Sequence, residues 1–154
     1  MILEKFPKLE AKTLAGRKVS FPEVTKGKKS FLVLAFEDKG EYENCQAQAD
    51  KWARFWETNL KKKDIVFYEV PMMSGKYSWI SFWVDSGMRS GIDKAKHDAV
   101  ACYYGDKEKY ITRLGIKNLR NAYVFLLDEE GNILITEDGE INDSKTEKIL
   151  RAVQ

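Results

Sequence analysis

The sequence is poor in the residues that build metal centres, redox pairs and membrane spans. Its two cysteines, Cys45 and Cys102, lie too far apart in the chain to form a CxxC pair. The only histidine, His97, rules out a site with several histidine ligands. No stretch approaches the roughly 18 uncharged apolar residues that a membrane-spanning helix needs. We therefore expect no metal, no cofactor and no transmembrane segment.

An excess of charge of one sign is also lacking. The chain has 26 lysines and arginines against 24 acidic residues, a formal net charge of +2. A nucleic-acid-binding protein normally has a far more basic face, so we expect no nucleic-acid partner. Two short basic runs, Lys26-Gly27-Lys28-Lys29 and Lys61-Lys62-Lys63, fall where turns are expected. We interpret them as solvated loops, with a phosphate or membrane-surface contact as the alternative.

Targeting and domain signals are sparse as well. The chain begins Met1-Ile2-Leu3-Glu4-Lys5-Phe6, without the apolar stretch of a secretory signal. A reducing interior, either the cytoplasm or an organellar matrix, is the expected location. No repeat or linker divides the 154 residues, so a single domain spanning residues 1–154 is predicted.

Hydrophobic patterns predict strands that alternate with helices. A hairpin is expected around Ala15-Gly16-Arg17-Lys18, and a last helix is expected to be capped by Asp143 or Ser144. Pro71 is expected to end the pairing of its strand. The other predicted elements are strands at 30–36, 65–70, 99–104, 123–128 and 133–136, and helices at 41–60, 77–88 and 107–114. This order indicates an α/β fold with a mixed sheet.

Two motifs at opposite ends of the chain narrow the choice of fold within the α/β class. Phe6-Pro7-x-Leu9 and Phe125-Leu126-Leu127-Asp128-x-x-Gly131-x-Ile133 resemble the thioredoxin-like superfamily, in particular its peroxiredoxin and lipoprotein-type thioredoxin branches. The resemblance implies a thioredoxin-like fold of the peroxiredoxin type. Such a fold has helices on both faces of a mixed sheet, here preceded by the N-terminal hairpin.

A further block resembles a narrower family. Asp85-Ser86-Gly87-Met88-Arg89-x-Gly91-Ile92, followed by His97 and the 123–128 strand, is similar to the mitochondrial ATPase assembly factor ten family. That resemblance implies a binding protein that helps to assemble the membrane sector of ATP synthase. Its partner would be a protein client, a hydrophobic or membrane subunit.

Surplus aromatic residues point to the same segment. Tyr77, Trp79, Phe82 and Trp83 cannot all lie on one side of a helix, so a docking surface for a client or a second copy of the chain is predicted. The candidate partner-binding residues are Trp79, Trp83, Asp85, Gly87, Met88, Arg89, Gly91 and His97.

Cys45 supports an alternative function. In redox thioredoxin folds the attacking cysteine lies at the start of the helix after the central strand, where the helix dipole favours a thiolate. Cys45 has this position relative to the 30–36 strand, and Arg120 is a conceivable partner. The alternative is therefore a one-cysteine thiol peroxidase or oxidoreductase that uses Cys45.

The surroundings of Cys45 favour a non-catalytic role. The peroxiredoxin pattern places Pro and Thr where this chain has Asp38 and Tyr42. Disulfide-handling members of the superfamily present a cis-proline before the strand that here begins at 123, but residues 118–122 contain no proline. Cys102, in a predicted strand, is expected to be a buried thiol that packs as a small apolar side chain. The leading prediction is a non-catalytic binding protein.

Overall fold

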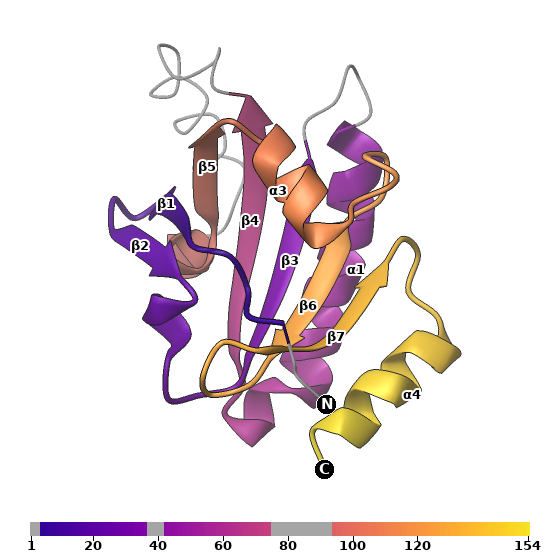
Figure 1. Cartoon of the computed structure of the whole chain (residues 1–154). Coiled ribbons are helices and arrows are strands. Elements are labelled where there is room, and N and C mark those ends of the chain that lie inside the picture. Colours follow the sequence, from indigo (N-terminus) through magenta and orange to yellow (C-terminus); the bar gives the residue numbers. More distant parts are fainter. Residues whose placement is uncertain (1–3, 37–41, 75–93) are drawn as a thin grey trace.

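The computed structural model describes residues 4–36, 42–74 and 94–154 of the chain. Within these residues, seven strands form one mixed sheet in the order β2-β1-β5-β4-β3-β6-β7, with helices on both faces (Figure 1). The strands are β1 (Leu9–Thr13), β2 (Lys18–Phe21), β3 (Ser30–Phe36), β4 (Val66–Ser74), β5 (Ala101–Gly105), β6 (Tyr123–Leu127) and β7 (Ile133–Asp138). The helices are α1 (Tyr42–Asn59), α3 (Glu108–Leu114) and α4 (Asp143–Ala152). Short 3-10 helices are η1 (Glu23–Thr25), η2 (Lys61–Lys63) and η4 (Lys94–Ala99).

These elements confirm most of the predicted pattern. The N-terminal hairpin, the 30–36 strand and the paired strands β6 and β7 lie where the sequence places them. The predicted helices at 41–60 and 107–114 correspond to α1 and α3. The predicted helix at 77–88 lies outside the described residues. The α/β fold with a mixed sheet is therefore confirmed.

Strand β3 lies in the interior of the sheet, between β4 and β6. It pairs in parallel with β4, from Ser30 opposite Val66 onward, and antiparallel with β6. All seven of its residues are buried. A strand that is covered by helices on both faces must be apolar on both sides, which explains the unbroken apolar run in its sequence.

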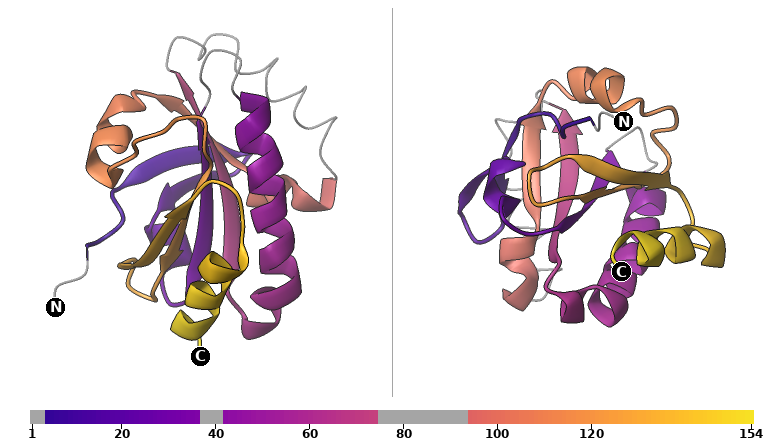
Figure 2. Two further views of the ribbon diagram at one scale, coloured as in Figure 1. Left: turned by 90° about the vertical axis from the view of Figure 1, so that its right-hand side faces the viewer. Right: turned by 60° about the horizontal axis from the view of Figure 1, so that its bottom comes forward.

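Helices cover both faces of the sheet (Figure 2), and each face has its own core of buried residues. Helices α1 and α4 cover one face, where Trp52 of α1 and Ile149 of α4 pack on Phe31, Val33 and Val124. Helix α3 and the N-terminal segment cover the other, whose buried residues include Phe6, Leu32, Leu34, Tyr110 and Phe125. The indole N–H of Trp52 donates to the Gly139 carbonyl at 3.0 Å, so this large side chain is buried without an unpaired donor.

The expected effect of Pro71 on its strand is wrong. Strand β4 continues past Pro71 to Ser74, and Pro71 lies opposite Ala35 in the ladder with β3. On its other side, β4 has a bridge between Glu69 and Val100, the residue before β5, and then pairs with β5 from Met72 onward. A proline lacks only its N–H, and Pro71 falls in the gap between these two points of pairing.

The predicted cap of the last helix is wrong by one residue. The side chain of Asn142, rather than that of Asp143 or Ser144, accepts a hydrogen bond from the Lys145 N–H at 2.9 Å. Asn142 has extended backbone angles, as a capping residue should, and α4 begins directly after it. Ile149 then faces the core, as the sequence predicts, and Val153 is partly buried against it.

A charged contact fastens the hairpin to η4. Arg17, in the turn of the hairpin, donates from Nε and Nη2 to the carboxylate of Asp98 at 3.0 and 2.9 Å. Nη2 also donates to the Tyr68 hydroxyl at 2.9 Å. The hydrogen bonds from Arg17 lower the pKa of Asp98 from its ordinary value. The ion pair thus fixes the edge of the sheet near η4.

Candidate functional site

The start of helix α1 meets the loop before β6, and we call this region the α1–β6 junction. It comprises Cys45 and Gln48 of α1 together with Leu119, Asn121 and Ala122 of the loop. In the thioredoxin-like fold that the sequence predicts, this is where redox members have their reactive thiol. The geometry of the junction therefore determines whether the Cys45 thiol is exposed to solvent or buried.

Gln48 holds the loop against α1. Its Oε1 accepts the backbone N–H of Ala122 at 2.8 Å, and its Nε2 donates to Oδ1 of Asn121 at 3.4 Å. Asn121 in turn donates to Oδ2 of Asp138 on β7 at 3.0 Å. Gln48 and Ala122 are both buried. A buried side-chain amide thus orders the loop that a cis-proline would order in the disulfide-handling relatives.

The thiol of Cys45 lies inside this junction. Cys45 is 0% exposed, and its Sγ donates to the carbonyl of Leu119 at 3.2 Å. A thiolate at this position would lose that hydrogen bond and would face the negative end of the carbonyl dipole. The described part of the junction therefore buries the Cys45 thiol and gives it a carbonyl as a hydrogen-bond acceptor.

Arg120, the other residue of the redox alternative, directly follows the residue that accepts the Cys45 hydrogen bond. Arg120 is exposed, and its backbone N–H donates to Oδ1 of Asn118, while the sulfur contacts the preceding residue, Leu119. Cys102 is a buried thiol on β5, as predicted, and packs with Leu14 and Val100 in a separate small cluster. The structure thus brings Cys45 to the loop that carries Arg120 and leaves Cys102 in a separate cluster.

Most of the predicted partner-binding residues lie outside the described residues: Trp79, Trp83, Asp85, Gly87, Met88, Arg89 and Gly91. His97 is described and half-buried. It lies in η4 rather than in the expected loop, next to Asp98. The surface role of His97 remains a prediction.

A second polar cluster, which the sequence analysis missed, lies on the α1 face of strand β4. Glu69 is 5% exposed, and its Oε2 accepts a hydrogen bond from Nε2 of Gln46 at 3.4 Å. The same nitrogen lies 3.0 Å from Oδ1 of Asp50, so one amide serves two carboxylates. We call Glu69, Gln46, Asp50 and the nearby Lys96 the Glu69 seam.

Burial changes the acidity of this carboxyl group. Desolvation raises the pKa of Glu69 to about 7. The hydrogen bond from Gln46 and the charge of Lys96 oppose this shift, whereas the negative charge of Asp50 adds to it. The sequence signal that could have revealed this cluster is Glu69 itself, the one acidic residue within the apolar run 65–70. A charged residue that faces a covered side of a sheet must be neutralised or solvated.

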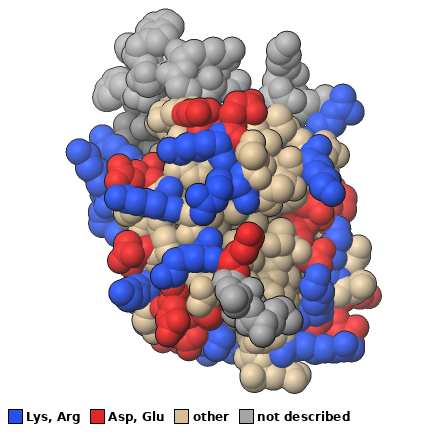
Figure 3. Space-filling model, in the orientation of Figure 1, with Lys and Arg blue, Asp and Glu red and all other residues tan. Residues whose placement is uncertain are grey.

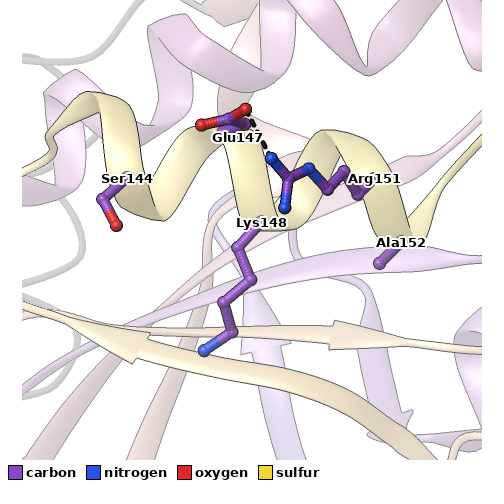
Figure 4. Close-up of a pocket in the computed structure, with 5 residues that line it drawn as sticks. All are labelled: Ser144, Glu147, Lys148, Arg151 and Ala152. Carbon is purple, nitrogen blue, oxygen red and sulfur yellow. Dashed lines mark hydrogen bonds and ion pairs between the residues drawn. The ribbon is translucent and has the colours of Figure 1, made fainter.

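Helix α4 carries a pocket on the surface of the molecule. This shallow pocket is lined by Ser144, Glu147, Lys148, Arg151 and Ala152 (Figure 4). Arg151 pairs with Glu147 at 2.7 Å, and Lys148 points to Glu137 on β7.

In the part of the chain that the structure describes, no three histidine, cysteine or acidic side chains are grouped to hold a metal ion. Among those same residues, no helix is both long and apolar enough to cross a membrane.

Comparison with known proteins identifies the family of the chain. The sequence matches the family model described as ATP10 protein over residues 4–154. No curated protein matches it significantly. Because the family match spans nearly the whole chain, it includes both the α1–β6 junction and the 85–97 block on which the predicted resemblance depends.

Solved structures share the fold at low sequence identity. The thioredoxin domain of a thiol-disulfide oxidoreductase from Bacteroides vulgatus has a TM-score of 0.65 and 16% identity, covering 100% of this chain and 99% of that one. The exposed lipoprotein thioredoxin Etrx1 from Streptococcus pneumoniae has a TM-score of 0.61 and 16% identity, covering 96% and 98%. BsSco, a member of the Sco family of cytochrome c oxidase assembly proteins, has a TM-score of 0.61 and 13% identity, covering 99% and 92%. The fold is therefore thioredoxin-like, as predicted.

Proposed function

Since the chain belongs to the ATP10 protein family of ATP synthase assembly factors, we propose that it binds a protein client and performs no thiol chemistry of its own. The family implies protein partners. We further propose that the client is a hydrophobic subunit of the membrane sector of ATP synthase. The binding surface would be the segment from Trp79 to His97.

One observation carries the non-catalytic part of this proposal. The thiol of Cys45 is fully buried and donates to the Leu119 carbonyl, although it follows the central strand at the position of a reactive cysteine. The thioredoxin-like structures named above include oxidoreductases, and the present chain has no second cysteine within reach of a CxxC pair. The burial of Cys45 and the lack of a CxxC pair thus support a binding role for this thioredoxin-like fold. Two buried thiols also fit the reducing compartment, cytoplasm or organellar matrix, that we propose.

Thiol reactivity tests the non-catalytic part. In a Cys102→Ala variant, the remaining thiol of native Cys45 should react with a disulfide reagent such as DTNB at least about 100-fold more slowly than in denaturant, because reaction requires local opening. Cys45→Ser provides the blank. Rapid oxidation of native Cys45 by hydrogen peroxide, faster than that of free cysteine, would support the peroxidase alternative and remove this proposal.

Client binding tests the surface. We expect Trp83→Ala and Arg89→Ala each to weaken capture of detergent-solubilised membrane-sector subunits of ATP synthase by about tenfold or more, since tryptophan and arginine dominate binding energies at interfaces. Arg54→Ala, which changes an exposed arginine of α1, is the matched control and should bind like the wild type. If both surface variants retain full capture, the client does not bind at 79–97.

A further inference from the structure

The two lysine runs of the sequence meet at one end of the molecule. Strands β3 and β4 are parallel and begin opposite each other, with Ser30 facing Val66, so the segments that precede them lie side by side. The Val66 N–H donates to the Lys29 carbonyl at 3.0 Å, and Lys28 pairs with Asp64 at 3.1 Å. We call this region the lysine end, and it lies at the bottom of Figure 1. Its members are Lys26, Lys28, Lys29, Lys61, Lys62 and Lys63.

Most of these lysines keep their charge available. Lys28 pairs with Asp64, and Lys29 pairs with Glu129 at 3.7 Å. In the described part of the chain, Lys26, Lys62 and Lys63 are exposed and make no ion pair. On the face seen in Figure 3, basic and acidic side chains are interspersed over most of the area. The lysine end therefore has three exposed lysines, Lys26, Lys62 and Lys63, that form no ion pair within the described residues.

Aromatic side chains border the lysines. Trp56 and Phe67 stack with their ring centroids 5.0 Å apart, and both are partly exposed. The ammonium group of Lys61 lies 5.9 Å from the Trp56 ring centroid. The Trp56 N–H donates to the Ile65 carbonyl at 2.7 Å, so the ring is held in place. Partly exposed tryptophan beside lysine is the combination found where proteins meet the headgroup region of a bilayer.

We propose that the lysine end docks on the surface of a bilayer rich in anionic phospholipids. The six basic residues are all lysines, which act as point charges toward a diffuse anionic surface, whereas arginine would be preferred for bidentate contacts with single phosphates. The two aromatic rings stack on each other and do not offer paired open faces to nucleic-acid bases. The exposed acids nearby, Glu23 of η1, Glu57 of α1 and Glu130 of the turn after β6, restrict the association to a weak, reversible one.

Vesicle binding tests this proposal. The full chain should co-sediment with phosphatidylcholine vesicles that contain about 30% phosphatidylserine but not with pure phosphatidylcholine, and added salt should release it. Replacing Lys61, Lys62 and Lys63 together with glutamine should weaken binding about 100-fold, since each lysine near an anionic surface contributes about fivefold. The matched control replaces Lys12, Lys18 and Lys117, which are exposed elsewhere, and should bind like the wild type.

An opposite change should strengthen binding. Asp64→Asn removes the partner of Lys28 and is expected to tighten vesicle binding by up to about fivefold. Asp64 has a left-handed backbone with φ of 61°, a conformation that asparagine also accepts, so this variant should fold normally. Three results would overturn the proposal: no binding to anionic vesicles, equal weakening by both triple substitutions, or lysine-dependent binding of single-stranded RNA without binding of vesicles.

Discussion

Glu69→Gln should stabilise the folded protein by about 3 kcal/mol at about pH 8 and leave it nearly unchanged at about pH 4. The wild-type carboxyl is buried, and its pKa of about 7 in the folded state compares with an ordinary value of 4.5. Because the folded-state pKa is raised, the folded protein is most stable while Glu69 is protonated. Stability then falls as the pH rises from the unfolded pKa through the folded one, and is constant above it.

Glutamine removes this titration and keeps the shape of the side chain. Its amide can still face Gln46 and Asp50 in the Glu69 seam. Urea unfolding midpoints over this pH range are the measurement, and Glu57→Gln is the matched control on the exposed side of α1. The control should change stability by less than about 0.5 kcal/mol at either pH. If the variant and the wild type lose stability with pH in parallel, Glu69 is not the titrating group.

Gln48→Ala is expected to lower the free energy of unfolding by about 2 to 3 kcal/mol. The substitution leaves the buried Ala122 N–H without its acceptor, removes the contact with Asn121 and opens space beneath the loop. Because the same loop covers Cys45 through the Leu119 carbonyl, reaction of Cys45 with DTNB should accelerate in parallel.

Gln48→Met separates hydrogen bonding from packing. Methionine has a similar length and fills the same space but accepts no strong hydrogen bond, so it should restore part of the packing and leave Ala122 unpaired. We expect its stability to lie between those of Gln48→Ala and the wild type. Unfolding by urea and the DTNB rate of Cys45 would be measured on all three. Wild-type thiol protection in Gln48→Ala would show that Gln48 does not control access to the junction.

Local sequence patterns were sufficient to predict those elements whose structure depends mainly on their own residues. The apolar run 30–36 predicted a strand buried on both faces, and its seven residues are buried in β3. The hairpin around Gly16 and the turn between β6 and β7 were equally predictable, because glycine with a positive φ closes tight turns. Helix α1 followed from the spacing of its apolar residues.

The sequence predictions failed where a neighbouring element decides the outcome. Pro71 interrupts a strand only if its missing N–H points at a partner, and the arrangement of β3 and β5 determines that. Asn142, Asp143 and Ser144 are all good capping residues, so the sequence does not choose among them. The side-chain contact of Asn142 with the Lys145 N–H decides the start of α4.

By itself, the sequence determined the thioredoxin-like fold, the assembly-factor family and the absence of a CxxC pair. Only the tertiary structure decided the surroundings of Cys45 and Glu69, because both side chains contact residues remote in sequence. The Leu119 carbonyl that accepts the hydrogen bond of the Cys45 thiol belongs to the loop before β6. The Gln46 side chain that donates to Glu69 belongs to α1. The two lysine runs meet for the same reason, since parallel pairing of β3 and β4 brings the segments before both strands together.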